Sequence, residues 1–372
     1  MSEPIRVLHV VTHMNRGGLE TMLMNYYRNI DRSQLQFDFL VHREKRADYD
    51  GEIESLGGRI YRLPPLNPFD IKYRKQLQQF FFDHPKYKIV HSHIDCMSAI
   101  PLKAAKKAGV PVRIAHSHSI SQDKDVKYLL KLFYKGFIAK NATHLMACGQ
   151  QAGEWMYGKR NFHILNNAID AKQYSFDHET YCAERAELGV RPDDVLVGHV
   201  GRFSPPKNHS FLIDVFAECV KMNSNAKLIL VGDGNLRSGI EGKVRALGLE
   251  KQVIFTGVRS DVAKLMQAMD VFLFPSVYEG LPLTVVEAQA AGLPCLISDA
   301  VPIECKKTSL VQQIALSMGA KAWATAVIKA VNTPRKNTCD EIKKSGYDVV
   351  ENAQKLQMLY ILLQKNPNRT IT

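Results

Sequence analysis

Short apolar segments alternate with helical patterns along almost the whole chain, and this alternation constrains the fold more than any other feature. In the first half, strands are expected over 6–12, 37–41, 60–63, 89–92, 112–115, 144–148 and 163–165, with helical patterns over 20–28, 73–82, 99–108 and 126–140. The second half repeats the pattern in DVLVGHVG, AKLILVGDG, QVIFTG, DVFLFP and PCLIS. Strands that are apolar along their length and separated by helices are typical of a parallel, doubly wound sheet.

The chain has 372 residues, which exceeds the size of one ordinary hydrophobic core. The sequence therefore predicts an α/β protein of two Rossmann-like domains, over 1–170 and 171–345, joined within a polar stretch at about 167–195. Residues 346–372 contain apolar side chains at helical spacing and predict a closing helix that is able to cross back to the first domain. A ligand that needs both domains is expected in the cleft between them.

Composition excludes several classes of protein. The net charge is +12 and the pI about 9.2, but no Lys/Arg block is interleaved with aromatics, so we expect no nucleic-acid partner. An anionic membrane surface or a phosphate-bearing substrate explains the charge better. No apolar run approaches the ~20 residues of a membrane span, and the N-terminus lacks the pattern of a secretory signal. Seven widely spaced cysteines indicate free thiols and a reducing cytoplasm.

The segment PSVYEGLPLTVVEAQAAGLP, residues 275–294, places two acids around a Gly-Leu-Pro turn. It follows an apolar strand and leads into a helix, with Pro282 expected in the first helical turn. The first N–H groups of a helix have no partner within the helix, and they favour an anion there. Glu279 and Glu287 are either two solvated acids or two ligands of a molecule bound at this turn.

Three further loops follow predicted strands. NRGGLETML contains Gly17 and Gly18 and opens a helix, but it is not the G-x-G-x-x-G of dinucleotide-binding proteins, and a plain turn explains it equally well. GRFSPPKNH presents Arg202 and Lys207, two cations suited to a diphosphate. FTGVRSD ends another strand and is suited to contacting a base or a phosphate through its backbone.

Four histidines end two predicted strands, in VHSH (90–93) and AHSHS (115–119). Since side chains alternate along a strand, each H-x-H pair lies on one face of the sheet. Such a cluster is able to bind a metal. Because no set of Asp or Glu partners of hydrolase type accompanies it, we favour hydrogen bonding to a sugar or an oxyanion.

Taken in order, these motifs resemble those of the retaining nucleotide-sugar glycosyltransferases of family 4, which have the GT-B fold of two Rossmann-like domains facing across a cleft. The shared features are the E-x7-E pair, EGLPLTVVEAQAAGLP, GRFSPPKN, LNNAID, and the early GG followed by Glu20. RIAHSHS, YEGLPL and the C-terminal tail are most similar to enzymes of bacterial exopolysaccharide or capsule synthesis. The chain departs from the family at Ala168, where many members have glycine, and at SDAVPIE, which replaces a Gly-rich loop.

The resemblance implies transfer of a hexose or N-acetylhexosamine from a nucleotide-diphosphate sugar, a UDP-sugar above all, to a saccharide or polyprenyl-linked acceptor, without a metal or other cofactor. It implies catalytic roles for His118 and Glu279, of which Glu279 would contact the donor sugar. Glu287 would bind the ribose, Arg202 and Lys207 the diphosphate, and Val258 would lie by the base. The remaining donor-binding positions are Gly17, Gly18, Gly280, Leu281, Pro282 and Leu283.

Other functions fit parts of the sequence. A sugar-nucleotide epimerase on the same fold, a histidine-metal hydrolase and an inactive partner subunit are the alternatives. The pattern over 126–140 also has two interpretations: a core-packed helix with a solvated face, or a basic amphipathic helix on the inner face of the cytoplasmic membrane. In the second case Lys124, Lys127, Lys131 and Lys135 would contact anionic lipid.

Overall fold

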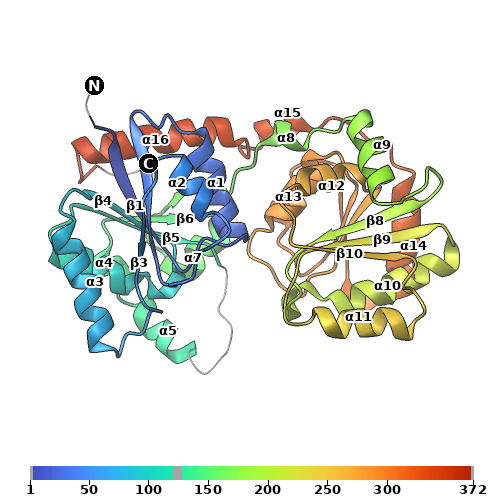
Figure 1. Cartoon of the computed structure of the whole chain (residues 1–372), viewed down its shortest axis with the longest axis horizontal. Helices are drawn as coiled ribbons and strands as arrows, with labels where there is room; N and C mark the ends of the chain where they lie inside the picture. The colour runs from blue at the N-terminus through green and yellow to red at the C-terminus, as the bar shows by residue number, and fades with distance from the viewer. Residues whose placement is uncertain (1–2, 120–127, 370–372) are drawn as a thin grey trace. The chain divides into compact units, whose positions relative to one another are not determined.

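The computed structural model describes residues 3–119 and 128–369 and consists of two compact units. The first unit comprises Met1–Ala168 and Val349–Thr372, and the second comprises Ile169–Asp348. Each unit contains one sheet in which every strand pairing is parallel, with helices on both faces (Figure 1). The units are described separately below.

The sheet of the first unit has seven strands in the order β3-β2-β1-β4-β5-β6-β7. The strand order reverses direction between β1 and β4, and such a switch point is where open parallel sheets bind ligands. The strands are β1 (Ile5–Val11), β2 (Leu35–Val41), β3 (Ile60–Arg62), β4 (Ile89–Ser92), β5 (Val112–Ser117), β6 (His144–Ala147) and β7 (His163–Ile164). The helices are α1 (Gly18–Asn29), α2 (Asp50–Ser55), α3 (Ile71–Asp83), α4 (Ala99–Lys107), α5 (Tyr128–Lys135), α6 (Ile138–Asn141), α7 (Gln150–Tyr157) and α16 (Val349–Lys365).

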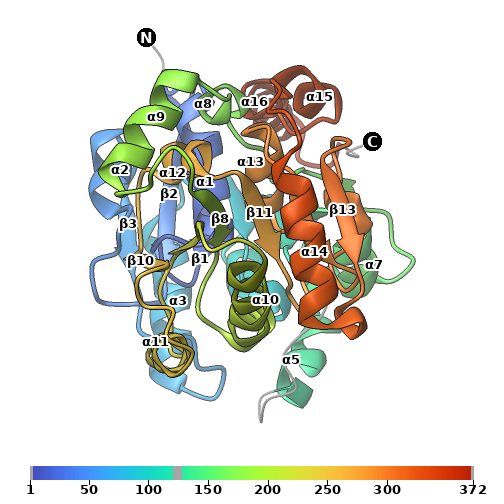
Figure 2. The same cartoon turned by 90° about the vertical axis from the view of Figure 1, so that its right-hand side faces the viewer.

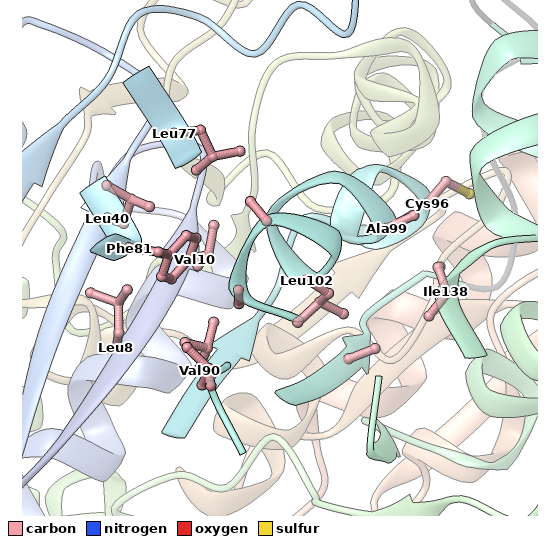
Figure 3. Packing of buried hydrophobic residues seen from close by; sticks show 14 of the residues in the cluster. Leu8, Val10, Leu40, Leu77, Phe81, Val90, Cys96, Ala99, Leu102 and Ile138 are labelled. Atoms are coloured by element: carbon pink, nitrogen blue, oxygen red, sulfur yellow. The ribbon is translucent and has the colours of Figure 1, made fainter. Parts of the chain in front are cut away.

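Alternate residues of β1 and β4 face the two sides of this sheet, because side chains alternate along a strand. On one side, Leu8, Val10 and Val90 pack against Leu77 and Phe81 of α3, as Figure 3 shows. On the other side lie α1 and the C-terminal helix α16, which pack against each other (Figure 1). His9 and His91 are paired residues of β1 and β4 and face the α1 and α16 side.

The sheet of the second unit has six strands in the order β10-β9-β8-β11-β12-β13, with its switch point between β8 and β11. Figure 2 shows α10 and α14 together on one side of it. The strands are β8 (Val195–Val200), β9 (Ala226–Val231), β10 (Val253–Gly257), β11 (Val271–Phe274), β12 (Cys295–Ser298) and β13 (Val311–Ile314). The helices are α8 (Ala171–Tyr174), α9 (His178–Glu187), α10 (His209–Met222), α11 (Arg237–Ala246), α12 (Val262–Ala268), α13 (Leu283–Ala290), α14 (Gly319–Val331) and α15 (Cys339–Lys344).

Two local predictions were wrong. The single helix expected over 126–140 is interrupted in its described part, since α5 ends at Lys135 and α6 begins at Ile138. Gly136 lies at the break, and glycine is a poor residue for a helix interior. Pro282 is the residue before α13 rather than a member of its first turn. No helix among the described residues is both long and apolar enough to cross a membrane.

Candidate functional site

The loops after β8 and β11 leave the second sheet at its switch point and are joined to each other. The backbone N–H of Val277 donates to the carbonyl of Pro206 at 2.8 Å, and the Asn208 amide donates to the carbonyl of Pro275 at 3.1 Å. These bonds fix the GRFSPPKN loop beside the loop that contains Glu279. The prediction that the two motifs share one edge of the sheet is confirmed.

Lys207 and Glu279 form an ion pair across these loops, with Lys207 Nζ donating to Glu279 Oε1 at 2.7 Å. The ammonium also lies 4.6 Å from the centre of the Phe274 ring, a cation–π contact. The two side chains are only 19% and 13% exposed, so the pair is screened from water more than a surface ion pair. Arg202 is exposed and makes no ion pair with the described residues, which leaves its guanidinium available to an anion.

A short segment leads from Glu279 into the first turn of α13. The segment from Gly280 to Leu283 is partly to fully buried, and α13 begins at Leu283. Among the four residues Gly280 to Leu283, Pro282 has no N–H, so three backbone donors remain for an anion. The structure thus places the Lys207–Glu279 pair at the segment that leads into the N-terminus of α13.

Glu287 lies further along α13 and is 5% exposed. Burial raises the pKa of its carboxyl to about 7, and a hydrogen bond from the Tyr174 side chain of α8 opposes this shift. Tyr174 was not predicted from the sequence. Its position shortly after LNNAID, behind the helix cap Asp170, is the only signal that would have drawn attention to it.

Glu287 makes the stability of the chain depend on pH. Its pKa in the folded chain is above the ordinary glutamate value of 4.5, so the folded chain binds this proton more tightly than the unfolded chain. The contribution to the unfolding free energy is fully present below about pH 4.5 and is lost as the pH rises through about 7. We expect Glu287→Gln to abolish this loss, which is roughly 3 kcal/mol for a shift of this size. Urea unfolding at pH 5 and pH 8 measures it, and equal pH dependence of both proteins would contradict it.

The loops after β9 and β10 complete this edge of the second sheet. A Cβ on Gly232, whose φ is +134°, would lie 2.2 Å from the carbonyl oxygen of Gly201, and one on Gly234 would lie 2.4 Å from that of Phe203. Only glycine allows the β9 loop to pack this closely on the loop that contains Arg202. Val258, directly after β10, is 57% exposed and provides an apolar surface at the same edge.

In the first unit, the glycine pair lies at the start of α1. Gly17 precedes the helix in an extended conformation, and a Cβ there would meet the Glu20 carboxylate at 2.4 Å. In turn, Oε1 of Glu20 lies 3.6 Å from Nδ1 of His13. A Cβ on Gly18 would have open space around it. Because the end of the Glu20 side chain is able to move, packing requires glycine at neither Gly17 nor Gly18.

The two predicted H-x-H pairs meet at the switch point of the first sheet, together with His9 of β1. Ring nitrogens of His93 and His118 lie 3.0 Å apart, as do those of His9 and His93. A second pair, His91 and His116, is 3.1 Å apart. The prediction that these histidines gather on one face is confirmed, while the contacts of His9 with His93 and of Tyr360 with His91 were not predicted.

Two sets of three in this cluster, His9-His91-His93 and His93-His116-His118, have ligand nitrogens within 4.8 Å of one another. Neutral imidazole is the form that binds transition metals. Burial lowers the pKa of His118 to about 3 and that of His116 well below its usual value, so both rings are neutral. The cluster therefore has the donor chemistry of a metal site and, equally, that of a hydrogen-bond network.

His118 follows β5 and is partly exposed, whereas the other histidines of this cluster are buried. Its backbone N–H donates to Asp95 Oδ1 at 3.2 Å, and the Ser119 hydroxyl donates to the other oxygen of the same carboxylate at 3.0 Å. Asp95 itself has a φ of +44°, an uncommon conformation for a residue other than glycine. The Asp95 carboxylate therefore holds the backbone at His118 in place.

Comparisons with known proteins fit this arrangement. Residues 17–162 match the model of the Glycosyl transferase 4-like domain, and residues 182–349 match that of Glycosyl transferases group 1. A Bacillus subtilis (strain 168) protein that has the name glycosyltransferase EpsF is 38% identical over 98% of both chains. An Escherichia coli UDP-Gal:alpha-D-GlcNAc-diphosphoundecaprenol alpha-1,3-galactosyltransferase is 26% identical over 96% of this chain and 97% of its own. The Staphylococcus aureus capsular polysaccharide biosynthesis glycosyltransferase CapH is 25% identical over 96% of this chain and 99% of its own.

Among solved structures, Anabaena HepE in complex with UDP-glucose has a TM-score of 0.79. It covers 96% of this chain and 100% of its own, at 19% sequence identity. This likeness concerns the fold, which is therefore of the GT-B type, as the sequence predicted.

Proposed function

Because this chain belongs to the glycosyltransferase family that these two models describe, we propose that it transfers a hexose or N-acetylhexosamine from a UDP-sugar in surface polysaccharide synthesis. The acceptor would be a saccharide or a polyprenyl-linked saccharide. The relatives named for capsule synthesis and for a diphosphoundecaprenol acceptor support this choice. The complex of HepE with UDP-glucose supports a UDP-sugar as donor.

The observation that supports the proposal most strongly is the Lys207–Glu279 pair at the switch point of the second sheet. As the bond between sugar and diphosphate breaks, negative charge grows on the phosphate. Lys207, Arg202 and the N–H groups before α13 stabilise that charge without the help of a metal ion. Glu287, once ionised, accepts hydrogen bonds from the ribose hydroxyls, and Val258 contacts the base.

We propose retention of the anomeric configuration by attack on the front face of the donor sugar. The bond from C1 to the phosphate oxygen breaks, the acceptor oxygen bonds to C1, and the departing phosphate takes the acceptor's proton. Glu279 is a poor nucleophile because Lys207 neutralises it at 2.7 Å. Its role is to position the donor sugar, while His118 hydrogen-bonds to the reacting sugar.

A screen of nucleotide sugars tests this function. We expect one UDP-sugar to raise the melting temperature of the chain and to be hydrolysed slowly in the absence of an acceptor. With a polyprenyl-linked saccharide added, the anomeric proton of the product should show the configuration of the donor by NMR. Activity should survive EDTA. An inverted product would overturn the mechanism, and absence of stabilisation by any nucleotide sugar would overturn the function.

The exposed face of α5 supports the proposal that this is a cytoplasmic enzyme that works at the membrane surface. Leu129 and Phe133, four residues apart on this helix, are 77% and 59% exposed, and Phe137 just beyond it is 41% exposed. Lys131 and Lys135 lie on the same short helix. Lys124 and Lys127, which the sequence placed in this basic surface, lie outside the described residues.

We expect the chain to bind vesicles that contain anionic lipid and not neutral ones, because each lysine near such a surface contributes about 1 kcal/mol. Sedimentation with vesicles measures this binding, which high salt should reverse. Leu129→Ser with Phe133→Ser should weaken it, whereas Phe82→Ser, at a residue 54% exposed on α3, serves as the matched control. Equal binding to neutral and anionic vesicles would contradict the prediction.

A further inference from the structure

Five buried or partly buried histidines of the first unit form two separate hydrogen-bonded series. The first, which we call the His91 series, runs from Tyr360 Oη to His91 Nδ1 at 2.6 Å and from His91 Nε2 to His116 Nδ1 at 3.1 Å. The second, the His93 series, runs from His9 through His93 to His118. Tyr360 belongs to α16 and reaches the sheet from the C-terminal end of the chain.

The rings in both series are neutral. Burial lowers the pKa of every one of these histidines, and the neighbouring rings lower those of His91, His93 and His116 further. A neutral imidazole has one N–H and one lone pair. Each contact between two rings therefore uses one donor and one acceptor, so the proton positions along a series are set together.

Tyr360 sets the direction of the His91 series. Its hydroxyl is fully buried, and among the described residues His91 is its only hydrogen-bond partner. Either direction leaves one buried donor unpaired, so the distance decides: 2.6 Å is shorter than the ~2.7–3.2 Å of N–H···O bonds and fits an O–H donor, so the hydroxyl donates to His91 Nδ1. His91 must then have its proton on Nε2, where it donates to His116 Nδ1. His116 in turn has its proton on Nε2.

The Nε2 of His116 is buried and has no hydrogen-bond partner among the described residues. Its ring centre lies 4.0 Å from that of His118. The His93 series has no group comparable to Tyr360 at either end, since His9 Nε2 and His118 Nδ1 are also without partners in the described part of the chain. Its direction is therefore free, whereas that of the His91 series is not.

We propose that Tyr360 is a positioning residue that fixes the tautomers of His91 and His116, so that His116 presents an N–H at Nε2 beside His118. The proposal rests on the proposed function only in that His118 is taken to contact substrate. A metal ion bound by His93, His116 and His118 is the competing explanation of the cluster. In the His91 series, His116 Nδ1 accepts from His91 and Nε2 has a proton, so neither nitrogen of His116 offers a lone pair to a metal.

The tautomers are measurable by NMR of the full chain with 15N-labelled histidine, using His→Gln variants for assignment. We expect His91 and His116 to show protons on Nε2. His42 provides the opposite reference, because its Nδ1 lies 2.9 Å from the carbonyl of Val11 and must donate to it. His116 found with its proton on Nδ1, as it would be if zinc were bound at Nε2, would overturn the proposal without any variant of Tyr360.

Tyr360→Phe should then allow both tautomers of His116 and lower kcat by roughly 2–10-fold, the equivalent of one hydrogen bond, with KM unchanged. Tyr73→Phe is the matched control, because it also removes a buried Tyr–His hydrogen bond, the 2.9 Å contact with His42 Nε2. It should change neither the His116 tautomer nor kcat. An unaltered His116 tautomer in Tyr360→Phe would show that Tyr360 only packs. If the tautomer changed but kcat did not, the hydrogen-bond network would have no role in catalysis, and the proposal that Tyr360 assists the reaction would be wrong.

Discussion

Replacing His118 with alanine is expected to lower kcat by about 10²–10⁴-fold, the usual effect of removing a group that assists a reaction by hydrogen bonding or proton transfer. His118 is the one residue of the cluster that is partly exposed, and its buried Nδ1 has no partner among the described residues. The effect should fall on kcat rather than KM, because the interaction matters mainly in the transition state. Steady-state kinetics with the donor found by the screen measures it.

The matched control is His144→Ala. His144 lies on β6 of the same unit, and its Nε2 is 2.9 Å from the carbonyl of Arg369. We expect it to affect stability and leave kcat within twofold of the wild type, an order-of-magnitude limit for a residue remote from the chemistry. If both variants lost activity equally, His118 would have no special role in the reaction.

Lys207→Ala should weaken the binding of UDP by roughly 10–150-fold, which corresponds to the ~1.5–3 kcal/mol of a charge-assisted hydrogen bond. The loss has two causes. The diphosphate loses a cation, and the Glu279 carboxylate, 13% exposed, is left without its partner beside the incoming negative charge. Isothermal titration calorimetry measures the affinity.

Lys221→Ala is the control for this experiment, because Lys221 also forms an ion pair, with Glu218 at 2.6 Å, but on the exposed surface of α10. It should leave UDP affinity unchanged. The double variant Lys207→Ala with Glu279→Gln should recover part of the lost affinity, since it removes the repulsive carboxylate. Unchanged affinity in Lys207→Ala would exclude this pair from the diphosphate site.

The sequence alone determined the fold class and which loops contain the polar residues. Apolar strands separated by helices have few stable arrangements other than a parallel sheet covered on both faces. Because the carboxyl ends of parallel strands share one edge, GRFSPPKN and the Glu279 turn could be placed together before any contact was known. The two H-x-H pairs could be assigned to one face for a similar reason, the alternation of side chains along a strand.

Which side chains touch was decided by the tertiary structure. The pairing of Lys207 with Glu279 spans 72 positions and depends on the strand order at the switch point, which no local pattern specifies. The pKa of Glu287 depends on burial under neighbouring elements, including the helix that contains Tyr174. Tyr360 lies 269 positions from His91 and meets it only because α16 packs on the first unit. Burial and long-range contacts arise when the whole chain packs, so residue type and spacing do not determine them.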